Sequence, residues 1–316
     1  MQLPDFIVIG ERRSGTTTLA KWMEVHPDVF MHPKVDMGYF IDEDVVGQRV
    51  WFDGHVEYSK WPRSHSMEQY AEMFSAANGE SAVGEKSADY LFWRPAHERI
   101  HEMVPNSKLI ITIRDPVERA WSHYWNEVGK GRETLSFEEA LVAEEERCRS
   151  SDYALDHLSY RTRGYYDESL RVLLKTFPQE QVLVTTLEQN RAMPQESLRR
   201  IYTFLDVDPS AGQSRAGEHV NANWTTIPSR FSRIPVVGWI ELLLERFSGR
   251  VVRKLIRDPH RARDIQRKMW GIIRKTKEDM EMRPETRGLL REQYEPHIVM
   301  LEKMLDRSFR ELRGAP

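Results

Sequence analysis

Three short runs of apolar, mostly β-branched residues constrain the fold of this 316-residue chain more than any other feature. Residues 6–9 read Phe-Ile-Val-Ile, residues 109–113 read Leu-Ile-Ile-Thr-Ile, and residues 182–186 read Val-Leu-Val-Thr-Thr. A run of this length without polar alternation is typical of a strand that is buried on both faces, as in parallel sheets. We therefore expect a parallel sheet whose strands are connected by helices.

Segments with helical periodicity separate these runs. Pro95 and Pro116 stand at first-turn positions, and Ser136 with Glu139 forms a capping-box pattern. We expect helices at residues 16–25, 67–77, 95–104, 116–129, 137–149 and 165–177, and a long amphipathic helix at 285–307. This order predicts an α/β fold of three layers, with helices on both faces of a mostly parallel central sheet and a helical C-terminal third.

The composition indicates one compact domain in a reducing compartment. We expect a single domain over residues 1–316, with an α/β core at 1–227, a basic helical insertion at 228–282 and a C-terminal helix at 283–316. The single cysteine, Cys148, excludes an intramolecular disulfide framework. The sequence contains neither a leader-like start nor the roughly 18 to 20 consecutive apolar residues of a membrane-spanning helix. A cytoplasmic protein is the expectation.

The net charge of −3 is unevenly distributed, because one tract of the chain is strongly basic. Between Arg246 and Lys277 there are twelve Lys and Arg residues against two acids, Asp258 and Asp264. Such a tract suits an anionic partner, whether nucleic acid, an acidic polysaccharide, a membrane surface or a phosphorylated cofactor. A solvated helix face without any partner has the same pattern, so the charge alone does not distinguish these alternatives.

The first apolar run leads into a glycine-rich turn. Residues 10–15 read Gly-Glu-Arg-Arg-Ser-Gly, and a predicted helix begins directly after them, a context in which backbone amides bind phosphate. Thr16 stands where nucleotide hydrolases place a lysine. The positive charges lie instead at Arg12 and Arg13, and at Arg114 after the second apolar run. These features favour a nucleotide without a γ-phosphate and a transfer that needs no metal.

Two segments resemble sulfotransferases that use 3′-phosphoadenosine 5′-phosphosulfate (PAPS). Residues 6–19 resemble the 5′-phosphosulfate loop of that family, and residues 108–124 resemble its 3′-phosphate motif, R-x-P-x-x-R-x-x-S-x-Y. Residues 84–90 are similar to the E-K-S-P-A-Y segment of the glycan-modifying branch, which includes heparan sulfate sulfotransferases and many bacterial relatives. Residues 283–294 resemble the P-E-T-R helix of bacterial members. The resemblance implies a P-loop-like fold and an enzyme that converts PAPS to 3′-phosphoadenosine 5′-phosphate (PAP).

The resemblance also implies which residues bind PAPS. The residues expected at the 5′ end are Arg12, Arg13, Ser14, Gly15, Thr16, Thr17 and Thr18. Those expected at the 3′-phosphate are Arg114 and Ser122, with Lys275 and Lys277 as further candidates. Arg13 stands where family members often have lysine, and it would stabilise the leaving 5′-phosphate with a bidentate fork. No metal is expected.

Three residues are candidates for the chemical step beside Arg13. Residues 34–40 are similar to the K-E-x-x-F-F segment of glycan sulfotransferases, whose Glu is the general base, and Asp36 stands at that position with a side chain one methylene shorter. His32, four residues earlier, is the alternative base. Lys86 matches a family lysine near the transferring sulfonate.

The implied function is sulfuryl transfer to a hydroxyl or amine of a carbohydrate, a lipid-like molecule or a small molecule. The basic tract would attract an anionic polysaccharide or lipid, with peripheral membrane contact as one form, and nucleic acid is not an expected partner. A kinase with a degenerate loop is an alternative, although Thr16 and the pair Arg114 and Ser122 argue against it. A nonenzymatic anion-binding protein is another, and it leaves both phosphate motifs unexplained.

Overall fold

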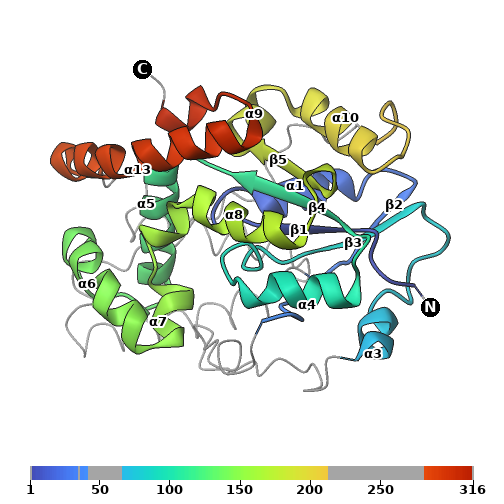
Figure 1. Cartoon of the computed structure of the whole chain (residues 1–316), viewed down its shortest axis with the longest axis horizontal. Coiled ribbons are helices and arrows are strands. Elements are labelled where there is room, and N and C mark those ends of the chain that lie inside the picture. Colours follow the sequence, from blue (N-terminus) through green and yellow to red (C-terminus); the bar gives the residue numbers. More distant parts are fainter. Residues whose placement is uncertain (1, 35, 42–65, 213–280, 315–316) are drawn as a thin grey trace, which may run out of the picture. The chain divides into compact units, whose positions relative to one another are not determined.

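A five-stranded parallel sheet forms the centre of the structure. The computed structural model describes residues 2–34, 36–41, 66–212 and 281–314. The strands are β1 (Phe6–Gly10), β2 (Val29–Met31), β3 (Ala82–Lys86), β4 (Lys108–Ile113) and β5 (Val182–Thr186). Their order is β2-β3-β1-β4-β5, and every neighbouring pair is parallel. The predicted α/β fold is confirmed (Figure 1).

Helices connect the strands close to the positions predicted from the sequence. The α-helices among the described residues are α1 (Thr16–Met23), α3 (Met67–Glu72), α4 (Pro95–Met103), α5 (Pro116–Gly129), α6 (Phe137–Ser150), α7 (Asp152–His157), α8 (Tyr166–Thr176), α9 (Leu187–Ala192), α10 (Pro194–Phe204) and α13 (Pro284–Leu305). The capping box of Ser136 and Glu139 begins α6 as predicted. Helix α3 is shorter than predicted because residues 73–76 form turns, and α13 continues through Pro296.

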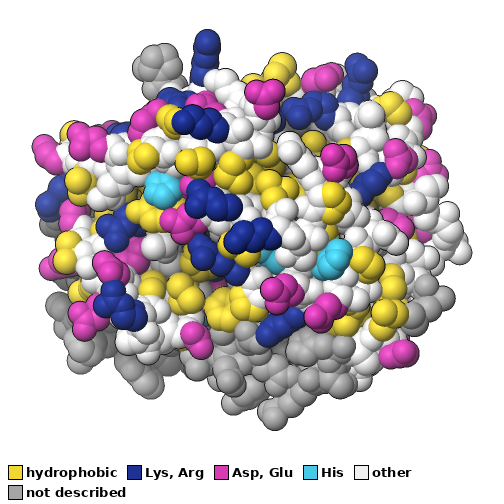
Figure 2. Space-filling model, in the orientation of Figure 1, with side chains coloured by type: hydrophobic (Ala, Val, Ile, Leu, Met, Phe, Trp, Pro, Cys, Tyr) yellow, Lys and Arg dark blue, Asp and Glu magenta, His cyan; other side chains and the backbone are white. Residues whose placement is uncertain are grey.

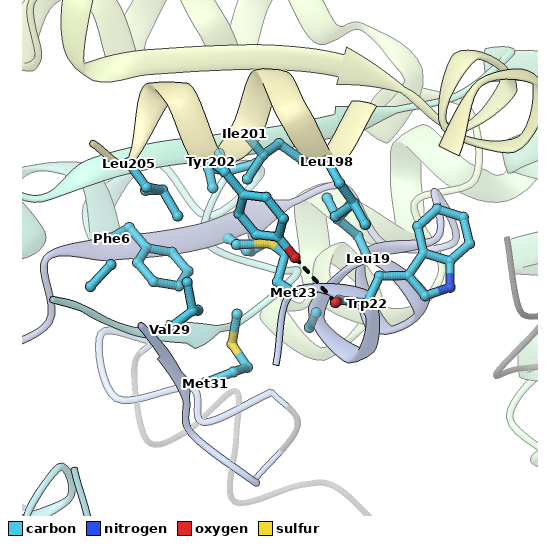
Figure 3. Close-up of a cluster of buried hydrophobic side chains, with 14 of the residues drawn as sticks. Phe6, Leu19, Trp22, Met23, Val29, Met31, Leu198, Ile201, Tyr202 and Leu205 are labelled. Carbon is cyan, nitrogen blue, oxygen red and sulfur yellow. Dashed lines mark hydrogen bonds between the residues drawn. The ribbon is translucent and has the colours of Figure 1, made fainter. Parts of the chain in front are cut away.

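One face of the sheet is covered by α1 and α10. Phe6 and Val8 of β1 are fully buried in a cluster with Met23 of α1 and Tyr202 of α10 (Figure 3). The Tyr202 hydroxyl donates a hydrogen bond of 3.4 Å to the carbonyl oxygen of Trp22, which ties the two helices together. The apolar cluster therefore fixes α1, and with it the loop that precedes α1.

The opposite face is covered as well. Because side chains alternate along a strand, Ile7 and Ile9 point away from the first cluster, and both are fully buried. Figure 1 shows α4 and α8 lying across the sheet, and their residues Ile100 and Leu173 have no exposed surface. Burial on both faces explains why the strands read as continuous apolar runs.

The strand order determines where a ligand would lie. After β1 the chain continues to β2 and β3 on one side of β1, and then to β4 and β5 on the other. The loops after β1, β3 and β4 therefore meet at the carboxyl edge of the sheet, at the point where the strand order reverses. Ligands of open α/β sheets bind at this position.

The chain divides into two compact units. One contains residues 1–124, 135–222 and 284–316, and the other contains 125–134 and 223–283. The sheet and the described residues of the candidate site belong to the first unit. Almost all of the predicted insertion at 228–282 lies outside the described residues, so the boundaries 1–227, 228–282 and 283–316 stay predictions. No helix in the described part of the chain combines the length and hydropathy that a membrane crossing requires.

Candidate active site

Residues 11–15, between β1 and α1, form a turn suited to phosphate. Arg13 and Gly15 have positive φ angles of 70° and 85°, and turns of this kind point successive amides into one concavity. The φ of 85° favours glycine at position 15, where a Cβ atom would also lie 2.5 Å from Leu187 Cδ1, the end of a flexible side chain. Helix α1 begins at Thr16, and its first-turn amides have no acceptor within the helix.

Ser14 lies in the middle of this turn and is fully buried. Its amide donates a 3.1 Å hydrogen bond to the carbonyl oxygen of Glu11, but its Oγ has no hydrogen-bond partner among the described residues. Thr17 and Thr18, the second and third residues of α1, are half-buried. A buried hydroxyl without a partner is costly, and a phosphate oxygen in the concavity would supply one.

The two predicted phosphate motifs meet at this turn. Arg13 Nε donates a 3.1 Å hydrogen bond to Ser122 Oγ on α5. Arg114, which follows β4, donates from Nη1 to the carbonyl oxygen of Arg13 at 3.5 Å. The structure therefore brings Arg13 to Arg114 and Ser122, which lie 101 and 109 residues further along the chain.

The guanidinium of Arg114 is mostly buried, and its ion pair with Glu118 is long. Its side chain is 14% exposed, and its ion pair with Glu118 spans 3.9 Å. Burial lowers the pKa of Arg114, and the nearby carboxylates of Glu118, Glu188 and Asp115 oppose that effect. A buried guanidinium with a distant counter-ion is well suited to bind a phosphate dianion, which would give it a charge-assisted bidentate partner.

Helix α13 holds the segment that carries Arg114. Arg291 donates to both carboxylate oxygens of Asp115, with a distance of 2.9 Å to Oδ1, and Arg287 pairs with Glu118. Burial raises the pKa of Asp115, and the hydrogen bond from Arg291 opposes the shift. The segment that resembles the bacterial P-E-T-R helix therefore holds the predicted 3′-phosphate motif in place through Asp115 and Glu118.

A second pair of candidate residues lies at the end of β3. Lys86 Nζ is 2.7 Å from Asp36 Oδ1, and the side chains are 3% and 34% exposed. The Ala88 amide donates to the same oxygen at 3.0 Å, and the Asp36 amide donates to the carbonyl oxygen of Lys86 at 3.0 Å. Asp36 has a φ of 56°, a conformation that Asp and Asn adopt more easily than most residues. Lys86 and Asp36 thus form an ion pair in which the lysine is buried and the aspartate is half-buried.

His32, the alternative base, lies just beyond β2. Its Nδ1 accepts a 3.1 Å hydrogen bond from the Lys34 amide, and its ring lies edge-on to Phe74 with 5.8 Å between the centroids. Burial lowers the pKa of His32, so the ring favours its neutral form. The bond from Lys34 occupies the lone pair that a neutral imidazole would use to accept a proton.

The Arg12 side chain forms ion pairs with Asp89 and Asp156. Its Nε lies 2.7 Å from Asp89 Oδ1, its Nη2 lies 3.1 Å from Asp156 Oδ1, and its side chain is 14% exposed. Its amide donates to Glu11 Oε1 at 2.7 Å. The structure places Arg12 in a network that supports the loop, and a contact between Arg12 and the nucleotide stays a prediction.

Arg12 belongs to a buried ion cluster, which we define as Glu11, Arg12, Asp89, Asp156 and Arg163. Arg163 is fully buried and lies 3.0 Å from Glu11 Oε1, 3.2 Å from Asp89 Oδ1 and 3.0 Å from Asp156 Oδ1. Burial raises the pKa of Glu11, and the charge of Arg163 opposes that shift. Asp156 and Arg163 were not predicted from the sequence, because no local pattern links them to partners in the loop that lie 144 and 152 residues away.

The comparison with known families identifies the chain. The model of the sulfotransferase family matches residues 4–210, which include the phosphate turn, the Lys86–Asp36 pair and the Arg114 segment. The chain belongs to the sulfotransferase family.

The chain is similar to several curated proteins. It is 30% identical over 204 residues to heparan sulfate glucosamine 3-O-sulfotransferase 3B1 of Mus musculus, which covers 65% of this chain and 46% of that protein. It is 28% identical over 216 residues to heparan sulfate glucosamine 3-O-sulfotransferase 5 of Homo sapiens, which covers 67% of this chain and 56% of that protein. The chain spans about half the length of the curated relatives it matches.

A solved structure matches the sulfotransferase over nearly its whole length. The sulfotransferase from Alicyclobacillus acidocaldarius has a TM-score of 0.68 and 26% sequence identity, covering 99% of this chain and 100% of that chain. The match supports the arrangement of the parallel sheet and its helices.

Two predicted contacts of the sulfotransferase lie outside the described residues. These are Lys275 and Lys277, together with the basic tract of residues 246–277 to which they belong. On the face that Figure 2 displays, basic and acidic side chains are interspersed over the described surface. The tract stays the predicted source of attraction for an anionic partner.

Proposed function

We propose that this sulfotransferase transfers a sulfuryl group from PAPS to a hydroxyl or amine of a carbohydrate or lipid-like acceptor. The observation that carries the proposal is the convergence of two groups at the carboxyl edge of the sheet. Arg13, Ser122 and Arg114 meet at the phosphate turn, and the Lys86–Asp36 pair ends the neighbouring strand β3.

The residues of the turn fit the 5′ end of PAPS. The amides at the start of α1 and the unpartnered Oγ of Ser14 offer donors for phosphate oxygens. Arg13 lies beside them, and its hydrogen bond to Ser122 can be exchanged for one to a ligand oxygen. Preorganised donors at the oxygen where charge develops are the usual source of catalysis in group transfer.

The residues after β4 fit the 3′-phosphate that distinguishes PAPS from ATP and ADP. Arg114 is mostly buried and makes a long ion pair of 3.9 Å with Glu118, and the Ser122 hydroxyl lies on the adjacent helix α5. Both belong to the segment that α13 fixes through Asp115. This arrangement supports selection of a nucleotide that carries a 3′-phosphate.

The chemistry is an in-line displacement at sulfur. The acceptor oxygen forms the new bond to sulfur, the bond between sulfur and the 5′-phosphate oxygen breaks, and the electron pair leaves on PAP. The acceptor proton passes to Asp36, whose Oδ1 is occupied by Lys86 and Ala88 and whose Oδ2 is the oxygen left for the proton. Lys86 lies beside Asp36, where its ammonium would face the transferring sulfonate.

The acceptor is proposed to be an anionic polysaccharide or an acidic lipid. The names of the relatives point to heparan sulfate glucosamine as the acceptor of those proteins. The basic tract at residues 246–277 would attract an acceptor of this charge.

Arg114→Ala should weaken PAP binding by about 1.5–3 kcal/mol, the range for one charge-assisted hydrogen bond. ADP affinity should stay within twofold, because ADP has no 3′-phosphate for Arg114 to bind. Calorimetric titration of each variant with PAP and ADP measures both values. Arg171→Ala, which changes a 53% exposed arginine on α8, is the matched control and should leave both affinities unchanged. A parental PAP affinity in Arg114→Ala would contradict the assignment of the 3′-phosphate site.

The proposed activity is tested by incubating the purified protein with PAPS and a panel of acceptors. The panel contains heparan sulfate, desulfated heparan sulfate, neutral glycans and hydroxylated lipids, and mass spectrometry quantifies PAP and sulfated product. We expect PAP formation that depends on one acceptor class and appears with an equal amount of sulfated product. PAP formation no faster than without protein, across the whole panel, would argue against the proposal.

A further inference from the structure

Glu85, the residue before Lys86 in β3, is a buried carboxylate that has no role in the proposed transfer reaction. It is fully buried, and its carboxylate accepts hydrogen bonds from Tyr70 at 2.7 Å, from Ser87 at 2.9 Å and from Tyr90 at 3.2 Å. All three donors are hydroxyl groups, and the adjacent cation of Lys86 pairs with Asp36 instead. Burial raises the pKa of Glu85 to about 7, and the hydrogen bonds from Tyr70 and Ser87 oppose the shift.

Ser87 links this carboxylate to the segment that carries Asp36. Glu85 and Ser87 are two residues apart in an extended chain, so their side chains point the same way. The Ser87 hydroxyl donates to Glu85 Oε2 and accepts from the Gly38 amide at 3.0 Å. The donation to Glu85 orients the hydroxyl so that its lone pairs face Gly38. Holding Gly38 also holds Asp36, two residues earlier, within hydrogen-bond distance of Lys86.

Tyr70 provides a second link between Glu85 and the same segment. Its hydroxyl donates to Glu85, and its ring stacks on Tyr39 with 4.6 Å between centroids and 28° between planes. The ring also meets Phe40 edge-on at 5.0 Å. Tyr39 and Phe40 directly follow Gly38, so the middle and the carboxyl end of residues 36–40 are both linked to one buried carboxylate.

We propose that Glu85 is a positioning residue of this enzyme, which holds residues 36–40 through Ser87 and Tyr70 so that Asp36 stays at Lys86. A buried carboxylate with every oxygen hydrogen-bonded restrains its neighbours more strongly than an apolar side chain would. The proposal rests on the proposed function in that Asp36 is taken as the base.

Hydrogen exchange of single amides, followed by NMR, tests the restraint without any substrate. In Ser87→Ala the Gly38 amide loses its acceptor, and we expect faster exchange to spread to the Asp36 amide, which is bonded to the carbonyl oxygen of Lys86. The expected acceleration at Asp36 is about tenfold or more. Ser107→Ala removes a hydroxyl of equal burial at the amino edge of the sheet, and it should leave the Asp36 amide unchanged. An Asp36 amide that exchanges at the parental rate in both Ser87→Ala and Glu85→Gln would overturn the proposal.

Turnover of PAPS with heparan sulfate as the probe acceptor supplies the second readout. Ser87→Ala should lower kcat about 10- to 100-fold, the range for a misplaced catalytic group, with the PAP dissociation constant within twofold of the parent. In an Asp36→Asn background the same change should alter kcat less than twofold, because it acts through Asp36. Equal losses in both backgrounds would overturn the proposal. A parent protein that neither binds PAP nor consumes PAPS would refute the proposed function instead, and the exchange result would still decide whether Glu85 restrains Asp36.

Discussion

Asp36→Asn should lower turnover of PAPS about 100-fold or more while leaving PAP affinity within twofold of the parent. The amide cannot accept the acceptor proton, and loss of a general base has an effect of at least this size. The substitution keeps the fold for two reasons. Asn adopts the φ of 56° found at this position, and its carbonyl oxygen can still accept the hydrogen bonds from Lys86 and Ala88. Steady-state kinetics and calorimetry measure the two values.

Two controls separate this effect from a general loss of structure. Asp28→Asn makes the same chemical change on an exposed turn residue and should leave kcat unchanged. His32→Gln removes the alternative base and should reduce kcat far less than Asp36→Asn, since the Nδ1 of His32 already accepts a hydrogen bond. If His32→Gln had the larger effect, the assignment of the base to Asp36 would be wrong.

Arg163→Met should destabilise the protein by about 3–5 kcal/mol, the range for removal of one partner from a buried ion pair. Methionine fills a similar volume, so the loss comes from charge and not from a cavity. Without Arg163 the carboxylates of Glu11, Asp89 and Asp156 would remain buried and only partly balanced. Urea denaturation of the parent and the variant measures the difference in the free energy of unfolding.

The destabilisation should also depend on pH. Burial raises the pKa of Glu11 and Arg163 opposes that shift, so the variant raises this pKa further. The folded variant then binds a proton more tightly than the unfolded chain, and its stability falls as the pH rises above the unfolded pKa. We expect a larger difference from the parent at pH 8 than at pH 5. Arg171→Met, at a 53% exposed position, should change stability by less than about 0.5 kcal/mol at both values. A parental stability in Arg163→Met would show that the cluster does not hold the loop.

The sequence predicted those parts of the fold that local patterns encode. Strands β1, β4 and β5 are continuous apolar runs, and the capping box at Ser136 marks the start of α6. Strand β2 has only three residues, and β3 contains Gly84, Glu85 and Lys86, so neither has the composition of a buried strand. The strand order is absent from any local pattern, because it depends on how distant segments pair.

The candidate site shows the same division. The resemblance indicated Arg13, Arg114, Ser122, Lys86 and Asp36, and the structure brings these residues into two groups. The residues that support them could not be predicted, because each support is a contact across the chain. Arg163 reaches Glu11 over 152 residues, and Arg291 reaches Asp115 over 176. Glu85 was visible within the segment that resembles E-K-S-P-A-Y, but its link to Gly38 through Ser87 appears only in three dimensions.

Calorimetric titration of the purified protein with PAP, and separately with ADP, both without metal, tests the central claim most directly. Both ligands have two phosphates on adenosine, but PAP has the second one at the 3′ position, which Arg114 and Ser122 are proposed to bind, whereas ADP has it on the 5′-phosphate. PAP should bind at least about tenfold more tightly than ADP, because one charge-assisted contact contributes about 1.5–3 kcal/mol. Equal affinity for the two nucleotides, or no binding of PAP, would contradict the assignment of this edge of the sheet to PAPS.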